Sequence, residues 1–465
     1  MNRREFLKGA AVAAAGSAAA AVSASPTGKA AAPRGIVYSR TVPVEHEADV
    51  FVAGGGPAGV CAALAAARAG KSVFLAEASG AFGGAATMAY VPAFATFSDG
   101  VRNVVGGIGL EIRRQVSQDI PETSYWTALD LEELKRVYDR MISESGVRFS
   151  FFTSVCDASA RDGHLEHVVL STKRGLLAVK AKIFVDCTGD GDLVAFAGGA
   201  FEMGDAEGGV MPCTLCSQWN DIDFSQQNPH PQSLLPKAIA DGVFSVPDLH
   251  LPGFFKGPYK GSSLGRGNIG HTYNVDPTDE RSLTKAMIDA RRRMPEWGRF
   301  YREYLKGYGK MRLASTAPYL GVRESRRVTC DYTLGVQDFV ARRQFDDQVG
   351  RYCYPVDVHT SKPGDKKAFE AFLKEYQKDL KYKKGESYGI PYRALVPKSF
   401  SNVLVAGRCM GTDQKMQASI RVMPGCFITG QAAGTAAALA LASGDVRAVR
   451  TAELRECLAK AGAIL

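Results

Sequence analysis

The chain has 465 residues, a formal net charge of +9, 46% hydrophobic residues and 23% charged residues. This length fits two or three globular domains, and the composition excludes a disordered or fibrous chain. Beyond the N-terminal segment no run of about 18 apolar residues occurs, which excludes a multispan membrane protein. Ten cysteines are too few for a disulfide scaffold, and no basic block interleaved with aromatic residues indicates a nucleic-acid partner.

The N-terminal segment combines paired arginines with a weakly apolar stretch. Residues 2–8 read Asn-Arg-Arg-Glu-Phe-Leu-Lys, and residues 9–22 are rich in glycine and alanine. This pattern predicts a twin-arginine signal peptide over 1–24, cleaved after Ala24, and a linker over 25–45. A membrane-anchoring helix is the alternative. Because the twin-arginine route carries folded proteins, we expect a periplasmic or other extracytoplasmic protein that is exported with a prosthetic group already bound.

A strand, a glycine-rich turn and a helix follow in chain order. An apolar run over 46–53 predicts a buried strand, and Gly54–Gly59 fits the pattern G-x-G-x-x-G. An alanine-rich helix over 57–69 and a strand over 72–76 come next. The second strand ends at Glu77, 23 residues after Gly54, where about 20 are expected before a ribose-binding acid. This order predicts a dinucleotide-binding unit.

Each glycine of this turn has a physical reason. Gly54 permits the tight turn, Gly56 lets the backbone approach a pyrophosphate, and Gly59 allows close helix–strand packing. Pro57 and Ala58 begin the helix, whose N-terminus attracts an anion. A second G-x-G-x-x-G, at 265–270, lacks both the preceding strand and the following helix, so we interpret it as a loop.

A second block over 129–197 predicts a helix at 131–145 and a β-meander. The predicted strands are Val147–Phe152, His167–Ser171 and Leu177–Val185, with turn residues between them. The last strand ends in the sequence Asp-Cys-Thr-Gly-Asp-Gly-Asp over 186–192. We expect this segment to be a second place where the backbone meets a ligand.

A third block over 402–442 contains a strand that closes at Gly407-Arg408 and a small-residue helix that begins near Pro424. So many small residues predict a helix pressed close to something flat. The division that we predict is a first nucleotide-binding part over 46–199, an inserted domain over 200–395, a C-terminal part over 396–445 and a terminal helix over 446–465. The inserted region includes predicted helices over 278–294 and 365–382 and extended runs over 213–219 and 352–359.

Taken together, six motifs in this order resemble the FAD-dependent oxidoreductases of the fumarate-reductase-like, or glutathione-reductase-type, flavoprotein superfamily. Beside Gly54–Gly59 with Glu77 and the 186–192 segment, the motifs are 82–87, 321–327, 388–393, and 405–408 with 419–424 and 430–434. The resemblance covers about residues 46–442. It implies an α/β fold: a Rossmann-like FAD-binding domain, with a parallel sheet and a β-meander, plus an inserted α+β substrate domain.

The resemblance also implies which residues bind FAD. Glu77 would bind the adenosine ribose, and the helix after Pro424 would point its N-terminus at the flavin pyrimidine edge, where its dipole favours reduced, anionic flavin. The predicted cofactor-binding residues are Gly54, Gly56, Pro57, Ala58, Gly59, Glu77, Gly83, Gly84, Thr87, Thr188, Gly189, Asp190, Gly407, Arg408, Arg421, Gly425 and Gly430.

Two departures from the superfamily qualify this assignment. Relatives with covalent flavin carry a histidine in the loop after the acidic residue, whereas residues 78–87 contain none. We therefore expect non-covalent FAD. Many relatives have Glu after the glycine of the C-terminal strand, whereas this chain has Arg408, which alters the expected ribityl contact.

Candidate catalytic residues lie outside the nucleotide motifs. Arg323, Glu324 and Arg326 belong to the densest charged cluster, which suits either a clamp on a substrate carboxylate or an internal ion-pair network. Asp357 and His359 are two apart in an extended run, so they share one face and could form a poised base or a simple domain contact.

Weaker candidates stand elsewhere in the inserted region. Tyr392 suits a proton donor or a packing residue, and His271 follows a glycine-rich stretch. Cys213 and Cys216 form a Cys-x-x-Cys, but residues three apart in a strand face opposite sides, which does not suit a disulfide, and no second such motif supports a metal site. The lysine-rich helix over 365–382 suits a solvated cover or a membrane surface.

The sequence thus predicts an exported enzyme that transfers a hydride between a small organic substrate and flavin N5. A quinone, oxygen or a small redox protein would exchange the electrons. The alternatives are a reductase of an unsaturated carboxylate, a redox-neutral lyase or isomerase acting on a sugar, and a non-catalytic FAD-binding subunit. The sequence identifies neither the substrate nor the oligomeric state.

Overall fold

A computed structural model describes residues 35–117, 121–251 and 253–465. The chain divides into two units, Met1–Thr41 and Val42–Leu465, and the described helices and strands begin at Val44 in the second unit. The predicted signal peptide and its cleavage site lie outside the described residues. Among the helices of the described ranges, none is long and apolar enough to cross a membrane.

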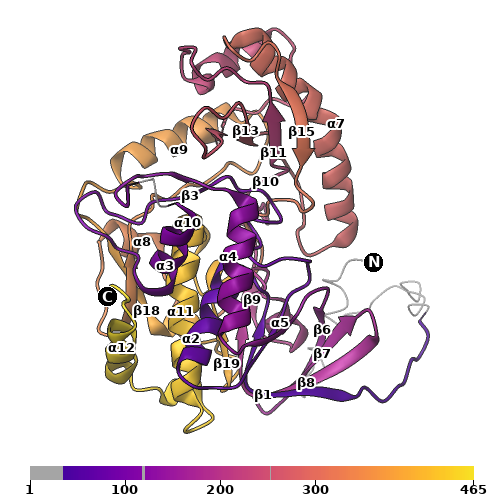
Figure 1. Ribbon diagram of the computed structural model, residues 1–465, viewed down its shortest axis with the longest axis vertical. Helices are drawn as coiled ribbons and strands as arrows, with labels where there is room; N and C mark the ends of the chain where they lie inside the picture. Colours follow the sequence, from indigo (N-terminus) through magenta and orange to yellow (C-terminus); the bar gives the residue numbers. More distant parts are fainter. Residues whose placement is uncertain (1–34, 118–120, 252) are drawn as a thin grey trace, which may run out of the picture. The chain divides into compact units, whose positions relative to one another are not determined.

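A seven-stranded mixed sheet organises the larger core (Figure 1). Its order is β5-β2-β1-β8-β7-β6, and β19 also pairs with β8. Strands β5, β2, β1, β8 and β19 run parallel, whereas β7 and β6 are antiparallel additions. The bounds are β1 Val44–Ala53, β2 Val73–Ala76, β5 Arg148–Ser150, β6 Ser154–Arg161, β7 His164–Thr172, β8 Gly175–Asp186 and β19 Val403–Val405. The predicted α/β class is confirmed.

The observed meander differs from the predicted one. Residues 147–152, predicted as its first strand, instead supply β5, which pairs with β2 in parallel. The meander is β6-β7-β8, and β6 was not predicted. Its sequence, Ser-Val-Cys-Asp-Ala-Ser-Ala-Arg, lacks large apolar residues because the strand lies at the edge of the sheet, partly exposed. Strand β8 then divides its free edge, pairing with β7 over residues 175–179 and with β19 over 184–186.

Two helices made largely of small residues lie side by side against the sheet (Figure 1). Helix α2 spans Pro57–Arg68 and helix α11 spans Met423–Ala440. A Cβ atom at Gly430 would lie 2.2 Å from the Ala58 carbonyl oxygen, and one at Gly434 would lie 2.1 Å from that of Ala62. The small residues of α11 therefore serve contact with another helix, rather than with a flat surface as predicted.

A second core is built around an antiparallel sheet of order β12-β13-β11-β15. The long helix α7 supplies Trp297, Phe300 and Tyr301 to it. The strands are β11 Ser217–Asn220, β12 Gly253–Lys256, β13 Gly265–Asn268 and β15 Arg312–Thr316, and α7 spans Glu280–Tyr304. The interpretation of 265–270 as a loop is therefore wrong: Gly265 to Asn268 form a central strand. A Cβ at Gly265 would come within 2.3 Å of the Phe254 ring, so glycine makes room for that aromatic side chain.

The remaining elements connect and cover these cores. Helix α9 spans Lys366–Lys378 and has no buried residue, although Phe372 and Tyr376 pack partly against the larger core, as expected of a solvated cover. Beyond Tyr352, the extended run predicted over 352–359 has no regular strand partner. The other helices are α3 Gly107–Val116, α4 Leu131–Glu144, α5 Asp192–Phe196, α6 Leu235–Ala240, α8 Val336–Val340, α10 Gln414–Ile420 and α12 Thr451–Lys460; short strands are β3 Ala93–Phe94, β4 Thr127–Ala128, β9 Phe201–Glu202, β10 Cys213–Thr214, β14 His271–Thr272, β16 Arg327–Val328, β17 Gln348–Tyr352 and β18 Tyr388–Pro391.

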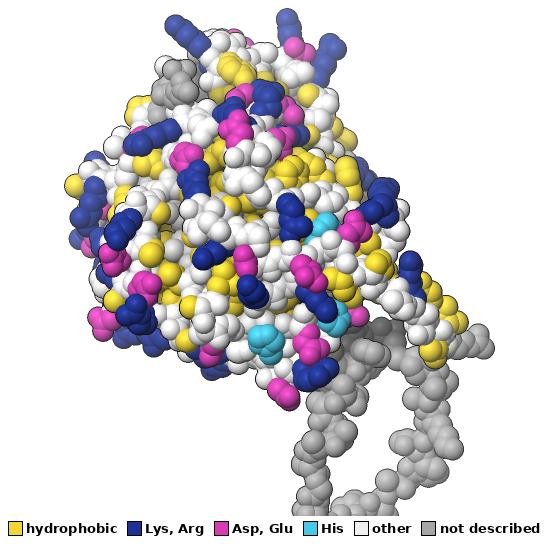
Figure 2. Space-filling model, turned by 60° about the horizontal axis from the view of Figure 1, so that its bottom comes forward, with side chains coloured by type: hydrophobic (Ala, Val, Ile, Leu, Met, Phe, Trp, Pro, Cys, Tyr) yellow, Lys and Arg dark blue, Asp and Glu magenta, His cyan; other side chains and the backbone are white. Residues whose placement is uncertain are grey.

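The two cores are separate in sequence as well as in space. The second core draws its buried residues from Cys213 to Leu320, whereas buried residues from Val328 to Val396 belong to the larger core. The domain division made from sequence stays a prediction. Lysine and arginine side chains are interspersed with acidic ones over the face shown in Figure 2, as the moderate net charge suggests.

Candidate functional site

Four parallel strands end at one edge of the main sheet. The register pairs Ala53 with Ala76 and with Asp186, and Asp186 with Val405. The segments that follow these ends are the predicted cofactor residues Gly54–Gly59, Glu77, Thr188–Asp190 and Gly407-Arg408. Ligands of open α/β sheets bind outside the carboxyl ends of the strands. The fold therefore brings four motifs, distant in sequence, to one edge.

The glycine-rich turn after β1 leaves room where a pyrophosphate would lie. Gly54 has a φ of +90°, and a Cβ at Gly59 would stand 1.8 Å from the Gly54 carbonyl oxygen. By contrast, a Cβ at Gly56 would meet no atom within 4 Å. Helix α2 begins at Pro57 without a side-chain cap, so its N-terminus remains available to an anion.

Glu77 and the following loop are packed onto this turn. One carboxylate oxygen of Glu77 accepts the Gly55 backbone N–H at 2.7 Å, and the other accepts the Ser79 N–H at 2.7 Å. Each oxygen can accept further hydrogen bonds, which leaves capacity for ribose hydroxyls. The Gly83 N–H donates to the Gly55 carbonyl at 2.8 Å, and the Thr87 hydroxyl donates to Phe82. A Cβ at Gly84 would lie 3.4 Å from Gly56.

Two arginines hold the loop that follows β8. Arg408 donates to the Asp190 carboxylate at 2.8 Å, and Arg326 donates to the Asp192 carboxylate at 2.7 Å and to the Asp190 carbonyl. The Thr188 hydroxyl donates to the Asp186 carboxylate at 2.7 Å. Arg326 therefore helps to fix the nucleotide edge, which comprises residues 54–59, 77, 188–190 and 407–408 at the strand ends. This arrangement fits the hypothesis that its charged cluster is an internal ion-pair network.

Glu324 lies in the same cluster and is wholly buried. Its carboxylate accepts the Met211 N–H at 2.8 Å and the Gly204 N–H at 3.1 Å, and pairs with Arg327 at 2.7 Å. The Gln414 amide also donates to it. These donors occupy both oxygens, so the structure gives Glu324 the geometry of a structural ion pair rather than of an acid–base group.

Arg421 joins the nucleotide edge to the second core. It stands two residues before α11, and its guanidinium donates to the Asp357 carbonyl at 2.9 Å and to the Arg323 carbonyl at 3.1 Å. Arg323 donates in turn to Thr214 at 2.8 Å and to Asn268 at 3.0 Å. Gly425, in the first turn of α11, leaves no room for a Cβ beside the Ile420 carbonyl.

Beside these arginines lies a cluster of histidines and carboxylates. His359 Nδ1 is 2.8 Å from His271 Nε2, and His359 Nε2 is 3.3 Å from the Asp357 carboxylate. His271 Nδ1 is 2.8 Å from the Asp248 carboxylate. His250 stacks on His359, with 4.3 Å between ring centroids. The predicted pair Asp357 and His359 is therefore adjacent, and His271 joins it from the second core.

Burial makes the neutral form of these histidines the stable one. It lowers the pKa of His250 to about 4 and also lowers that of His271. Burial and then the charge of Arg323 lower the pKa of His359 well below its usual range. For Asp248 and Asp357, burial alone would raise the pKa, but electrostatic attraction and hydrogen bonds from neighbouring groups, including the Arg421 charge beside Asp357, outweigh it and the pKa of each is lowered.

The spacing of His250, Asp357 and His359 would also admit a metal ion, since their ligand atoms lie within 4.8 Å of one another. However, the rings of His250 and His359 are nearly parallel, at 15°. The lone pairs of parallel stacked rings do not converge on one ion. The geometry therefore favours hydrogen bonding over metal binding here.

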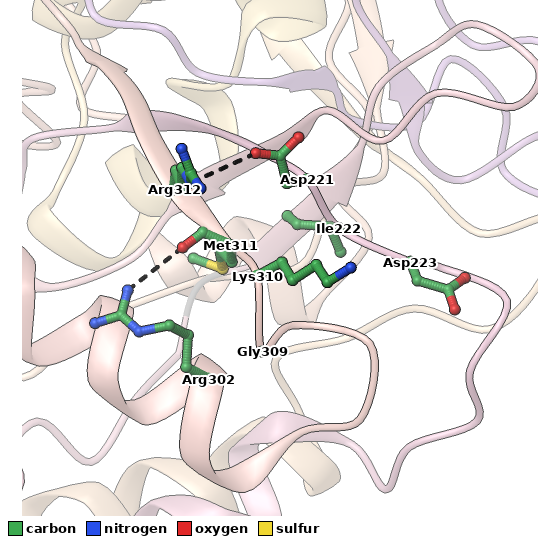
Figure 3. A pocket seen from close by; sticks show the side chains of 8 residues that line it. All are labelled: Asp221, Ile222, Asp223, Arg302, Gly309, Lys310, Met311 and Arg312. Atoms are coloured by element: carbon green, nitrogen blue, oxygen red, sulfur yellow. Dashed lines mark hydrogen bonds and ion pairs between the residues drawn. The ribbon is translucent and has the colours of Figure 1, made fainter.

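Not every predicted residue belongs to this arrangement. Tyr392 is buried and its hydroxyl donates to the Val446 carbonyl at 2.8 Å, an arrangement that fits the packing role rather than the proton-donor role considered for it. Cys213 and Cys216 are both buried free thiols. The pocket in Figure 3 is lined by Asp221–Asp223, Arg302 and 309–312 and includes none of the predicted site residues; there Arg312 faces Asp221 and Arg302 faces the Met311 carbonyl.

Asp248 and His250 were missed from the sequence. A signal was present, because Asp248-Leu249-His250 repeats the Asp-x-His spacing of Asp357-Val358-His359. A single occurrence of this pattern is weak, whereas two in one inserted region would have indicated a shared site.

The fold and the edge of four converging strand ends define a dinucleotide-binding protein of the Rossmann type. Over residues 49–458 the chain matches the family model described as FAD dependent oxidoreductase. It therefore belongs to the FAD-dependent oxidoreductase family, is an enzyme of that class, and has FAD as its cofactor.

Solved structures with similar folds were also found. A geranylgeranyl bacteriochlorophyll reductase-like protein from Thermoplasma acidophilum is 11% identical, with a TM-score of 0.45 over 90% of this chain and 84% of that one. The p-nitrophenol 4-monooxygenase PnpA from Pseudomonas putida is 15% identical, with a TM-score of 0.44 and the same coverage. No curated protein matches the chain.

The residues at the sheet edge fit FAD. The open space at Gly56, the uncapped start of α2 and the spare acceptor capacity of Glu77 suit a pyrophosphate and a ribose. The clamped loop over 188–190 and the start of α11 suit the rest of the cofactor.

Proposed function

We propose that this protein is an exported FAD-dependent oxidoreductase that oxidises a small hydroxyl-bearing substrate beside the histidine–carboxylate cluster. The observation that carries the proposal is the position of His359. It is buried, it contacts Asp357 and His271, and Asp357 is tied through its carbonyl to Arg421, just before the helix expected at the flavin. A base at this place would serve the reacting end of the cofactor.

When bound, FAD would supply the oxidant, accepting two electrons as a hydride at N5. The chain itself must then bind the substrate, exclude water and remove the hydroxyl proton. A buried neutral histidine can accept that proton. Tyr125 and Trp126 pack around Tyr354, whose hydroxyl donates to Asp357. With 46% and 41% exposure, the first two offer an aromatic surface to a substrate beside the base.

The arginine cluster supports a carboxylate reductase less well. The Arg323 guanidinium already donates to Pro212, Thr214 and Asn268, and Arg326 is engaged with the 190–192 segment. Donors that are spent on the protein are poor candidates for a substrate clamp.

An anaerobic titration of the purified mature protein tests the hypothesis that the protein oxidises its substrate as an oxidase or dehydrogenase. Pools of alcohols, sugars and acids are added while the visible flavin spectrum is recorded. Bleaching by a hydroxyl-bearing pool supports the proposal. An oxidised spectrum that no pool bleaches, but that an unsaturated acid restores after chemical reduction, would replace it with a reductase.

The proposal that the protein is exported depends on the predicted twin-arginine signal peptide over residues 1–24. Replacing Arg3 and Arg4 together by lysine should leave the precursor inside the cell, while single Lys8→Gln as the matched control should not. Cleavage of the double variant as efficient as that of the natural chain would refute twin-arginine export. Outside the inner membrane, a quinone, oxygen or a small redox protein would take the electrons.

A further inference from the structure

Four side chains form one continuous chain of contacts across the two cores. It runs from Asp248 through His271 and His359 to Asp357, with distances of 2.8, 2.8 and 3.3 Å. The Asp248 side chain is 4% exposed, and the Asp357 side chain is 31% exposed. The chain of contacts thus has a closed end and an end that reaches the surface.

At the closed end, the hydrogen bond between His271 and Asp248 can run in one direction only. Asp248 accepts the His271 backbone N–H at 2.8 Å, the Tyr273 hydroxyl at 3.3 Å and the His250 backbone N–H at 3.3 Å. A carboxylate that receives these donors is ionised and can only accept. His271 must therefore donate from Nδ1, which leaves its Nε2 as an acceptor. The contact at 2.8 Å then requires His359 to donate from Nδ1.

At the open end, no N–H proton remains for the contact between His359 Nε2 and Asp357. Two neutral imidazoles carry two N–H protons, and the first two contacts use both. The third contact joins the lone pair of His359 Nε2 to the Asp357 carboxylate, and at 3.3 Å it is the longest of the three. The Tyr354 hydroxyl donates to the same carboxylate oxygen at 3.3 Å. Asp357 therefore has another donor, and Nε2 has no proton to give it.

We infer that His359 Nε2 is held as a vacant proton acceptor for the substrate hydroxyl, and that Asp248 and His271 are positioning residues that fix its tautomer. The inference deepens the proposed function and rests on it. In the balanced step, the substrate would lose the hydrogen of its C–H bond together with both bonding electrons, as a hydride that FAD would take up when bound. The O–H proton passes to His359 Nε2, and the substrate becomes a carbonyl compound.

The surrounding charges suit reversible uptake of this proton. Protonated His359 would lie beside Asp357 and be linked through His271 to Asp248, so two carboxylates favour it. Arg323, Arg421 and His250 oppose it, since each faces the cluster with present or potential positive charge. The hydroxyls of Tyr273 and Tyr354 face the two carboxylates and remain protonated, because burial raises the pKa of each.

The first test reads the tautomers directly and needs no substrate. The chain has seven histidines, and ¹⁵N-histidine spectra of the FAD-bound protein at pH 7, assigned with His271→Gln and His359→Gln, would resolve the two rings. We expect both to be neutral and protonated at Nδ1. An imidazolium or an Nε2-protonated ring at His359 would overturn the inference.

Asp248→Ala makes the second test. It removes the acceptor that holds the His271 proton on Nδ1, so the Asp357 carboxylate becomes the acceptor that decides the polarity. Both ring protons should then move to Nε2, which fills the vacant acceptor of His359. The rate of flavin reduction should fall by about 10²–10⁴-fold with FAD still bound. Asp241→Ala, an exposed matched control, should change neither spectrum nor rate.

The outcomes separate the two proposals. If no substrate pool bleaches the flavin, the proposed function fails, while the tautomer spectra still decide the polarity. If Asp248→Ala reverses the tautomers but leaves the rate of flavin reduction within about twofold of the natural enzyme, His359 is not the base and the inference fails.

Discussion

The nucleotide edge and the histidine cluster are built in different ways. At the edge, each contact is made by a short motif whose residues act within one turn: Gly54, Gly59 and Glu77 lie in one strand–turn–helix–strand unit. The cluster instead joins single residues from distant segments, such as Asp248 and His359. A site of the first kind can be read locally, and one of the second kind depends on how two cores meet.

The largest expected effect tests the local character of the edge with two glycines of the same turn. Gly59→Ala would place a Cβ 1.8 Å from the Gly54 carbonyl oxygen, so we expect loss of more than about 4 kcal/mol and little folded protein. Gly56→Ala meets no atom within 4 Å, so the protein without FAD should keep its unfolding temperature while FAD binding weakens. Thermal unfolding and flavin content separate the two effects, and equal instability of both variants would contradict this account.

The next largest effect concerns the buried ion pair of Glu324 with Arg327. Glu324→Gln leaves Arg327 buried without its charge partner, which typically costs about 3–5 kcal/mol. Denaturant unfolding should show this loss, while the flavin spectrum of the remaining folded protein should be unchanged. Glu202→Gln is the matched control, because Glu202 also faces Arg327, at 3.8 Å, but its side chain is 74% exposed. A catalytic Glu324 would instead give a stable variant with lost turnover.

The same contrast explains which features could be predicted. The order of strand, glycine turn, helix and acid was predictable because each piece has a local physical cause. Strand β6 was not, because its edge position permits polar residues. Nor was β13, where backbone pairing to β11 and β12 stabilises a strand of poor intrinsic propensity.

Prediction of the candidate site was limited in the same way. Asp357 and His359 were recognised as a pair because they stand two positions apart in an extended run, and His271 was noted as a weaker candidate. Their contact with His271 and with Asp248 depends on the second core, of whose sheet only the extended run over 213–219, which overlaps β11, was predicted. Arg326 was identified as important, but its partner, Asp192, lies 134 residues away in sequence.

A pH titration of stability tests the cluster as a buried unit. Because burial lowers the pKa of His250 to about 4, the unfolded chain binds more protons than the folded one between about pH 4 and 6.5. Stability should therefore be full above pH 6.5 and fall as the pH is lowered, with His250 contributing about 3 kcal/mol of that loss. His250→Phe should flatten this part of the curve. The exposed His164→Gln should leave it unchanged, and a curve that His250→Phe does not alter would show that His250 is solvated.

The smallest expected effect is the lack of reaction of the Cys213 and Cys216 thiols with a thiol reagent in the folded protein. Burial raises the pKa of Cys213 to about 11 and that of Cys216 to about 12, so both stay protonated and unreactive at neutral pH. In the native protein a thiol reagent should label the exposed Cys156 first, and Cys156→Ser should remove that rapid phase. Labelling of Cys213 or Cys216 should appear only with unfolding. Rapid labelling of either in the folded protein would show that the junction between the cores opens, and that the cluster beside it is less closed than the nucleotide edge.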